Sequence, residues 1–172
     1  MLAACRCGTV AIELAGAPIL STACYCTSCQ EAGRRIESLP DAQPLRVADG
    51  GTPFLLYRKD RVRCLRGGEH LAMHRLTPDS PTRRAVATCC NAAMFLDFTK
   101  GHWLSVYRAR LPVDAPPLEM RIMTADQPAG VALPDDVPNH AGYPGRFMAR
   151  LLLAWLAMGF RRPAVKGVPA RP

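Results

Sequence analysis

The chain has few aromatic residues and no long hydrophobic run. Phe, Trp and Tyr together make up 6% of its 172 residues, although apolar residues reach 49%. No apolar stretch attains the roughly 18 residues of a membrane-spanning helix, which argues against an integral membrane protein. The first residues, Met1 to Cys7, lack the basic head and apolar core of a secretory signal. We therefore expect a cytoplasmic protein whose cysteines are thiols or metal ligands rather than disulfides.

Lysine is scarce, although the net charge is +8. All but three of the 22 basic residues are arginine, and these arginines are scattered along the chain. They are not interleaved with aromatic residues, as they are in proteins that bind single-stranded nucleic acid. A GC-rich genome would give the same enrichment in Arg, Ala, Gly and Pro. Only the charge favours a nucleic-acid binder, so we expect neither nucleic acid nor membrane as a partner.

Residues 1–125 consist of short segments in which apolar and polar residues alternate, separated by Gly, Pro and Asp. Such alternation is typical of strands, and many strands with few helical stretches predict a mainly β, antiparallel body. The expected strands span 9–15, 53–58, 61–65, 70–76, 84–88, 92–97, 103–107 and 118–124.

The remainder of the chain differs in composition and hydrophobic pattern. Residues 126–142 form a Pro-rich loop, residues 143–162 one apolar C-terminal helix, and residues 163–172 a loose tail. The helix is apolar nearly all round, so it needs a buried environment. We expect it to dock onto its own β body; a homodimer interface through this helix and contact with a membrane surface are the alternatives.

Three cysteines lie within six residues, Cys24, Cys26 and Cys29. Zinc prefers thiolate ligands in tetrahedral sites, and a catalytic zinc keeps one position open. Three thiolates without a local fourth ligand therefore predict an open site that accepts water or a substrate thiolate. A distant Cys or His that closes the site is the alternative.

Two further pairs, Cys5 with Cys7 and Cys89 with Cys90, provide the ligands of a second, structural site. Adjacent residues of a strand point to opposite faces, so Cys89 and Cys90 share one ion only if the chain turns there. Otherwise one of them completes the first site and the other points elsewhere. Cys64 stands alone and is expected to be a small buried hydrophobe.

These motifs resemble a known family. Cys-x-Cys-Gly, then Cys-x-Cys-x-x-Cys, then a late cysteine pair is similar to the glutathione-dependent formaldehyde-activating enzymes, grouped with centromere protein V. The resemblance runs from Cys5 to about Phe98 and implies a zinc-stapled antiparallel β-tent. It implies a structural zinc on Cys5, Cys7 and Cys90, and a second, catalytic zinc on the three middle cysteines, Cys24, Cys26 and Cys29.

One motif departs from the family pattern. The family's late motif is Cys-x-x-Cys-Gly, whereas here Ala87 stands at the first cysteine and Asn91 replaces the glycine. Cys89 is the candidate substitute for the missing ligand. The chain therefore looks like an uncharacterised branch of the superfamily.

The resemblance implies that glutathione, or another small thiol, adds to formaldehyde to give S-hydroxymethylglutathione, with carbon–sulfur lysis as the reverse. Arg34 and Arg84, together with Arg35, are the candidates to pair with the carboxylates of the tripeptide. The alternative function is a non-catalytic zinc-stapled module that binds a partner.

Overall fold

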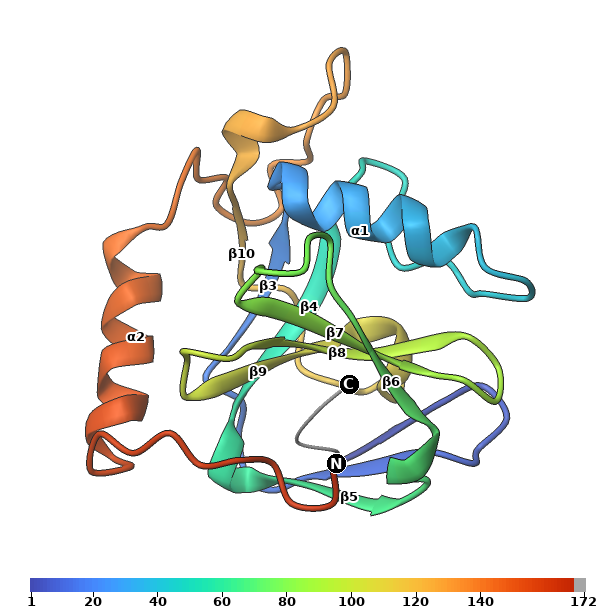
Figure 1. Ribbon diagram of the computed structural model, residues 1–172. Coiled ribbons are helices and arrows are strands. Elements are labelled where there is room, and N and C mark those ends of the chain that lie inside the picture. The colour runs from blue at the N-terminus through green and yellow to red at the C-terminus, as the bar shows by residue number, and fades with distance from the viewer. Residues whose placement is uncertain (169–172) are drawn as a thin grey trace.

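A computed structural model describes residues 1–168 and shows a mainly β protein with two α-helices (Figure 1). The helices are α1 (Thr27–Glu37) and α2 (Gly145–Leu156). The strands are β1 (Leu2–Ala4), β2 (Ala11–Leu14), β3 (Leu20–Cys24), β4 (Thr52–Arg58), β5 (Val62–Arg66), β6 (Leu71–His74), β7 (Thr82–Ala87), β8 (Ala92–Phe98), β9 (Trp103–Tyr107) and β10 (Met120–Ile122). No helix among these residues is long and apolar enough to cross a membrane.

The strands form two sheets that are mostly antiparallel. The larger sheet has the order β10-β3-β4-β9-β8-β7-β6, and the smaller has the order β1-β2-β5. The pair β10–β3 is parallel, with Ile122 opposite Cys24. Strands β4 and β5 are joined by a single turn at Lys59–Arg61, yet they belong to different sheets. The expected antiparallel body is thus confirmed, with one parallel pair as an exception.

The central strands of the larger sheet, β4, β9 and β8, are buried on both faces. On β4, Leu55 and Tyr57 pack with the small sheet, whereas Phe54 and Leu56 pack toward the helices. This division follows from the two-residue period of a strand. In Figure 1 the small sheet lies at the bottom of the view and α1 crosses the top. The two thiol clusters described below lie in the cores on these two sides.

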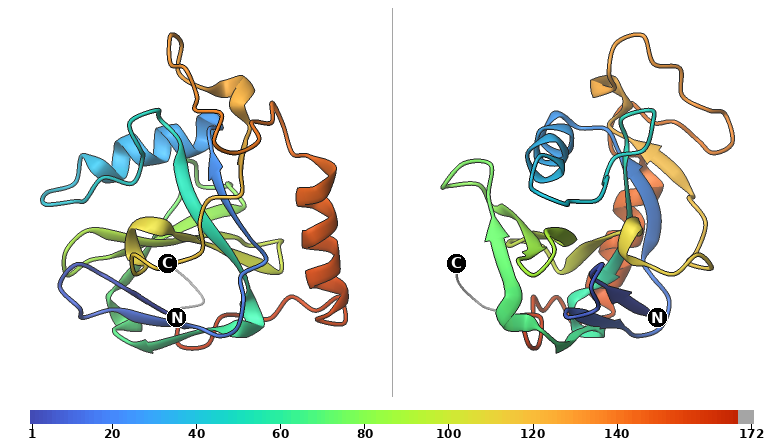
Figure 2. Two further views of the ribbon diagram at one scale, coloured as in Figure 1. Left: turned by 180° about the vertical axis from the view of Figure 1, so that it is seen from behind. Right: turned by 90° about the vertical axis from the view of Figure 1, so that its right-hand side faces the viewer.

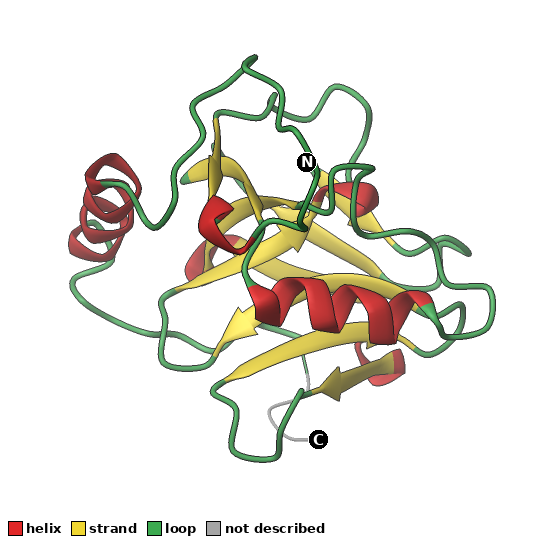
Figure 3. Ribbon diagram, turned by 90° about the horizontal axis from the view of Figure 1, so that it is seen from above, coloured by secondary structure: helices red, strands yellow, loops and turns green. Residues whose placement is uncertain are grey.

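Helix α1 is the main correction to the expected fold, which has a single C-terminal helix. Its buried face consists of Cys29, Ala32, Gly33 and Ile36, at helical spacing. Three of these four side chains are small, and glycine lowers helix propensity, so the pattern gives a weak signal. A Cβ at position 33 would lie 2.7 Å from the Arg46 side chain, so a larger residue than glycine requires that side chain to move. Seen from above, α1 lies over the strands of the sheet (Figure 3).

Helix α2 docks by a narrow stripe rather than by its whole surface. Phe147 and Leu151 are buried, whereas Leu152, Leu153 and Leu156 are each more than half exposed. Figure 2 shows α2 at the edge of the molecule. The expectation that this helix buries itself on the β body is therefore wrong for most of its apolar surface.

The chain after α2 is more ordered than the expected loose tail. It runs back to the small sheet, where the Cys64 amide donates to the Lys166 carbonyl (2.9 Å). Residues 169–172 of that tail lie outside the described residues.

Candidate metal centres

The structure brings Cys5, Cys7, Cys89 and Cys90 into one cluster, in which all four Sγ atoms lie within 4.8 Å of one another. Cys5 and Cys7 belong to the turn after β1, and the late pair belongs to the turn between β7 and β8. The chain therefore turns at Cys89 and Cys90, and both point to the same place. We refer to this group as the four-thiol cluster.

The four-thiol cluster has the donor set and spacing of a tetrahedral zinc site. Zinc–sulfur bonds of about 2.3 Å require sulfur atoms about 3.8 Å apart in a tetrahedron. The Sγ atoms of Cys5 and Cys7 are 3.6 Å apart, and Cys89 Sγ lies 3.8 Å from Cys5 and 3.3 Å from Cys7. The Val10 amide donates to Cys5 Sγ (3.2 Å). These four residues fit a closed zinc site.

The departure from the late motif of the family has a structural explanation. Ala87 ends β7, so the ligand comes instead from the following turn, at Cys89. Asn91 has a φ of +49°, in the left-handed region that glycine occupies most readily and asparagine tolerates. The turn therefore keeps its backbone conformation without glycine. The side-chain amide of Asn91 also donates to the Pro40 carbonyl (2.9 Å).

The Sγ atoms of Cys24, Cys26 and Cys29, the three-thiol cluster, also lie within 4.8 Å of one another. Cys24 ends β3, Cys26 is the N-cap residue of α1, and Cys29 lies in the first turn of α1. No fourth cysteine, histidine or carboxylate joins this group within residues 1–168. Three thiolates fit one face of a zinc ion and leave a further position for a fourth donor.

Hydrogen bonds that involve Gln30 and Asp126 hold the turn between β3 and α1 in place. The Gln30 side-chain amide donates to the carbonyls of Tyr25 (2.5 Å) and Asp126 (2.6 Å). The Asp126 carboxylate accepts from the Thr27 amide (3.3 Å) at the start of α1. The chain after β10 therefore fixes the turn that carries Cys26.

The three thiols differ strongly in acidity. Hydrogen bonds from the Cys24 and Cys29 thiols, aided by the backbone amides of Cys29 and Ser28, lower the pKa of Cys26 to about 3. Because they donate to neighbouring sulfur, the pKa of Cys24 is raised to about 12 and the pKa of Cys29 lies well above its usual value. One negative charge is thus centred on Cys26, at the positive end of α1.

Arg84 lies beside this cluster and is almost entirely buried, with 2% of its surface exposed. Its Nη2 donates to the carbonyl oxygen (3.1 Å) and to the hydroxyl (2.9 Å) of Ser28, which stands between Cys26 and Cys29. Nε and Nη1 are buried without a hydrogen bond of ordinary geometry. The buried Tyr107 hydroxyl also lies beside the guanidinium, which partly offsets the rise in the Tyr107 pKa that burial causes. Arg34, the other predicted binding arginine, lies on the exposed side of α1 in an ion pair with Glu31.

Tyr143, just before α2, is about half exposed and lies within electrostatic reach of the three-thiol cluster; it was not predicted. Burial and the charges of Cys24, Cys26 and Cys29 raise the pKa of Tyr143 to about 12. Its hydroxyl is therefore protonated at neutral pH and is a hydrogen-bond donor. No motif marks it, because it lies far along the chain from the cysteines.

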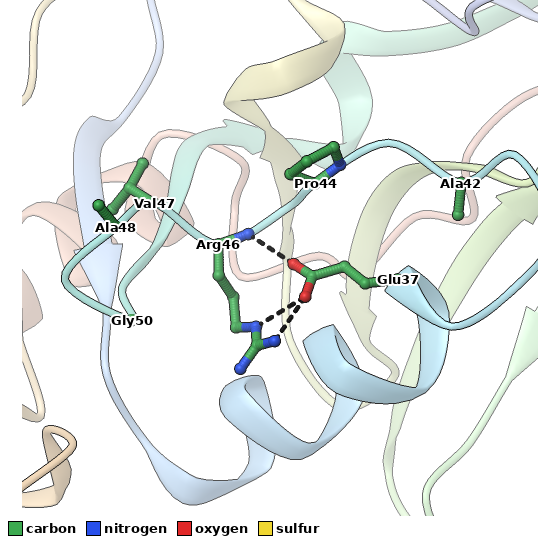
Figure 4. Close-up of a pocket in the computed structure, with 7 residues that line it drawn as sticks. All are labelled: Glu37, Ala42, Pro44, Arg46, Val47, Ala48 and Gly50. Atoms are coloured by element: carbon green, nitrogen blue, oxygen red, sulfur yellow. Dashed lines mark hydrogen bonds and ion pairs between the residues drawn. The ribbon is translucent and has the colours of Figure 1, made fainter.

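A cavity of about 330 Å³ lies between the end of α1 and the following loop (Figure 4). Glu37 projects into it and accepts from Arg46 Nε (3.0 Å) and from the Arg46 amide (2.9 Å). The charged groups of this cavity are paired with each other, and no thiol lines it. It has no part in the chemistry of the clusters.

Comparison with protein families, rather than with solved structures, agrees with the cysteine pattern. A crystal structure of a Rhodobacter sphaeroides protein, determined as a structural-genomics target, is 19% identical, with a TM-score of 0.47 over 81% of this chain and 99% of that one. No curated protein matches the chain. The family model described as glutathione-dependent formaldehyde-activating enzyme matches residues 1–110, a stretch that includes both thiol clusters. The chain therefore belongs to the glutathione-dependent formaldehyde-activating enzyme family.

Proposed function

We propose that this protein is a zinc-binding enzyme of the carbon–sulfur lyase, or S-hydroxymethylglutathione synthase, type that acts on glutathione or another small thiol. One observation carries the proposal. The three-thiol cluster has three donors and no fourth among residues 1–168, whereas the four-thiol cluster has four. The first suits an open catalytic zinc, and the second suits a structural zinc that staples the β-tent.

The reaction needs an ionised thiol held beside an aldehyde. Zinc bound to Cys24, Cys26 and Cys29 would lower the pKa of a fourth thiol and hold its thiolate. In the overall reaction the substrate thiol loses its proton, and a sulfur–carbon bond forms as the carbonyl π bond of formaldehyde breaks. The carbonyl oxygen takes up a proton, so the S-hydroxymethyl product contains every atom of both reactants.

Side chains of this protein provide charge and a proton donor near the cluster. Arg84, held on Ser28, balances the negative charge of three thiolates around a divalent ion. Tyr143, protonated at neutral pH, is available to donate a hydrogen bond to the oxygen that becomes a hydroxyl. Arg34 is exposed on the same helix and is assigned to a carboxylate of the tripeptide.

Zinc stoichiometry of the reduced protein tests this proposal. We expect two zinc ions in the wild type and one in Cys26→Ser, with glutathione protecting the second ion of the wild type from a chelator. Cys64→Ser is the matched control, because Cys64 belongs to neither cluster. A wild-type protein with one zinc that Cys26→Ser does not remove would contradict the proposal. If both ions are present, formation of S-hydroxymethylglutathione is then measured directly.

The exposed face of α2 favours a second candidate function, a zinc-stapled interaction module that forms a homodimer. Met148, Leu152 and Leu156 follow one another at four-residue spacing, and each is more than half exposed. A second copy of the same face is a suitable partner, because this face carries no acidic residue. Sedimentation of the wild type and of Leu152→Glu tests this: we expect a dimer that the substitution dissociates. A wild type that is monomeric at high micromolar concentration would exclude it.

The proposal assigns the protein to the cytoplasm, with a small thiol as ligand and neither nucleic acid nor membrane as partner. All eight cysteines are free, and both clusters need a reducing compartment to keep them as thiolates.

A further inference from the structure

Tyr25 stands between two of the three thiols and points away from them. Residues 24–26 are extended: Cys24 ends β3, and Cys26, with φ −59° and ψ 149°, is the N-cap residue of α1. Neighbouring side chains of an extended chain point to opposite sides. Cys24 and Cys26 accordingly pack in the core on the helix side of the sheet, and Tyr25 does not. The direction of the Tyr25 ring is therefore linked through the backbone to the direction of both thiols.

The loop that enters β4 encloses the end of this ring. Thr52, the first residue of β4, is the strand partner of Cys24, so the residues just before it lie beside Tyr25. Tyr25 has no exposed surface. A Cβ at position 51 would lie 2.6 Å from Tyr25 Cζ and 2.7 Å from its hydroxyl oxygen. The Asp49 carboxylate holds the loop in this place, because it accepts from the Gly51 amide (3.0 Å). The close contact with the ring therefore depends on glycine at position 51.

Asp49 and Arg121 both lie beside the Tyr25 hydroxyl. Burial and the Asp49 carboxylate raise the pKa of Tyr25, and the Arg121 guanidinium partly offsets that rise. Arg121, on β10, is the strand partner of Ala23, two residues before Tyr25, so its side chain lies on the same face as the ring. Arg121 Nε lies 3.9 Å from the Asp49 carboxylate, and Nη1 donates to Asp136 (2.8 Å). Because β3 lies between β10 and β4, groups from both neighbours meet at this phenol (Figure 1).

The direction of a ligand matters for a metal site that is assembled from different elements. Cys29 is fixed by the first turn of α1, whereas Cys26 precedes that turn and depends on the residues next to it. The Gln30 side chain holds the turn from the helix side, by its hydrogen bond to the Tyr25 carbonyl (2.5 Å). The Tyr25 ring holds it from the opposite face. Removal of such an outer partner of a ligand typically weakens metal binding by about 10–100-fold.

We propose that Tyr25 is a positioning residue, which aims Cys24 and Cys26 at a common metal ion. Gly51 and the two charged groups beside the hydroxyl hold the ring in place. Tyr25 touches neither the ion nor the substrate thiol, and it acts only through the direction of the two ligands. The inference rests on the zinc site of the proposed function.

Gly51→Ala tests the role of the ring, because the new Cβ must displace Tyr25 while every cysteine is kept. Competition with a chelating indicator, in the reduced full chain, gives the dissociation constant of the zinc ion that Cys26→Ser lacks. We expect Gly51→Ala to raise this constant about tenfold or more and to leave the ion of the four-thiol cluster unchanged. Gly101→Ala is the matched control. A Cβ at position 101 would lie 2.9 Å from the Trp103 ring, in the turn between β8 and β9, so the same substitution and the same kind of clash occur outside both clusters.

Tyr25→Phe is the second variant, and it keeps the test decisive if Gly51→Ala does not fold, because it adds no atom. It removes the hydroxyl on which Asp49 and Arg121 act, and we expect about tenfold weaker binding of the same ion. Tyr57→Phe is its control, since Tyr57 is also fully buried but packs on the side of the small sheet. A purely structural role would lower the melting temperatures of the two tyrosine variants and leave zinc affinity unchanged in both.

The outcomes separate this inference from the proposed function. Wild-type affinity for that ion in both Gly51→Ala and Tyr25→Phe would overturn the positioning role and leave the proposed function standing. A wild type that holds a single zinc, unaffected by Cys26→Ser, would overturn the proposed function and this inference together. Weaker binding in both variants, with wild-type affinity in Gly101→Ala and Tyr57→Phe, is the result that the positioning role requires.

Discussion

Replacement of Cys89 by serine should destabilise the protein far more than replacement of Cys26 by serine. Both changes remove one thiol from a candidate zinc site, and the substituted atom is the same. They differ in how much of the chain the cluster connects. Cys7 and Cys89 are 82 positions apart and join the small sheet to the turn between β7 and β8. The three-thiol cluster spans only the end of β3 and the first turn of α1.

The magnitude follows from the entropy of closing each loop. With the relation used for disulfides, a cross-link over the 82 positions contributes about 4.5 kcal/mol, whereas one over the five from Cys24 to Cys29 contributes about 2 kcal/mol. A chain of this size changes its melting temperature by about 2–4 °C per kcal/mol. Cys89→Ser should therefore lower the melting temperature by about 9–18 °C, and Cys26→Ser by about 4–8 °C.

Thermal unfolding followed by circular dichroism in reducing buffer measures both values, with zinc content determined on the same samples. Cys64→Ser is the control for loss of a partly buried thiol outside the clusters. Equal shifts for Cys89→Ser and Cys26→Ser, each with loss of one zinc, would refute the loop-closure argument. Full zinc content in Cys89→Ser would show that Cys89 is not a ligand.

Three further predictions use the same structure. In chelator-treated protein, Cys26 should stay a thiolate as the pH falls from 7 to 5, because its pKa is about 3. The rate at which Cys26 is alkylated, measured by mass spectrometry, should therefore not change, whereas the rate for an ordinary thiol falls about tenfold per pH unit. Asn91→Ala, at φ +49° and with loss of a 2.9 Å hydrogen bond, should cost about 1–2 kcal/mol in urea unfolding, and Asn91→Gly less. Asp97→Asn breaks a buried pair with Lys59 (2.8 Å) and Arg83 (2.9 Å), so we expect a loss of about 3–5 kcal/mol; a loss below that of Asn91→Ala would contradict it.

The strands with clear alternation were predictable, and those without it were not. The segments 92–97 and 103–107 correspond closely to β8 and β9. Strand β3 escaped prediction because all five of its residues are buried, so that no polar face marks it. Strand β1 also escaped prediction, because its three residues are too few to show an alternating pattern. Helix α1 escaped prediction because its buried stripe consists mainly of small side chains. As a result, the sequence pattern assigned the segment that carries Cys24, Cys26 and Cys29 to no helix or strand.

At the candidate site, the spacing of the cysteines predicted which thiols come together, but not the groups around them. The placement of Cys89 depends on a turn whose geometry the sequence pattern leaves open. Arg84 lies on β7 among the residues that face α1, and its burial depends on a helix that was not expected. Tyr143 comes within electrostatic reach of the cluster only through tertiary structure. Local spacing therefore identifies ligands that are close in sequence, and it fails for groups that the fold brings from elsewhere.

The late motif shows how four thiols can come together although the sequence pattern has changed. In the family pattern one ligand lies three residues before the second cysteine, but here Ala87 occupies that position at the end of β7. Because the chain reverses between β7 and β8, a cysteine within the turn itself reaches the same point, and Cys89 Sγ lies 3.3 Å from Cys7 Sγ. The reversal needs one residue with positive φ, which Asn91 accepts in place of glycine. The two substitutions therefore compensate within a single turn, and the ligand position is set by backbone geometry rather than by motif spacing. The three-thiol cluster has no such freedom, because its spacing is fixed by the first turn of a helix, and it keeps the family spacing.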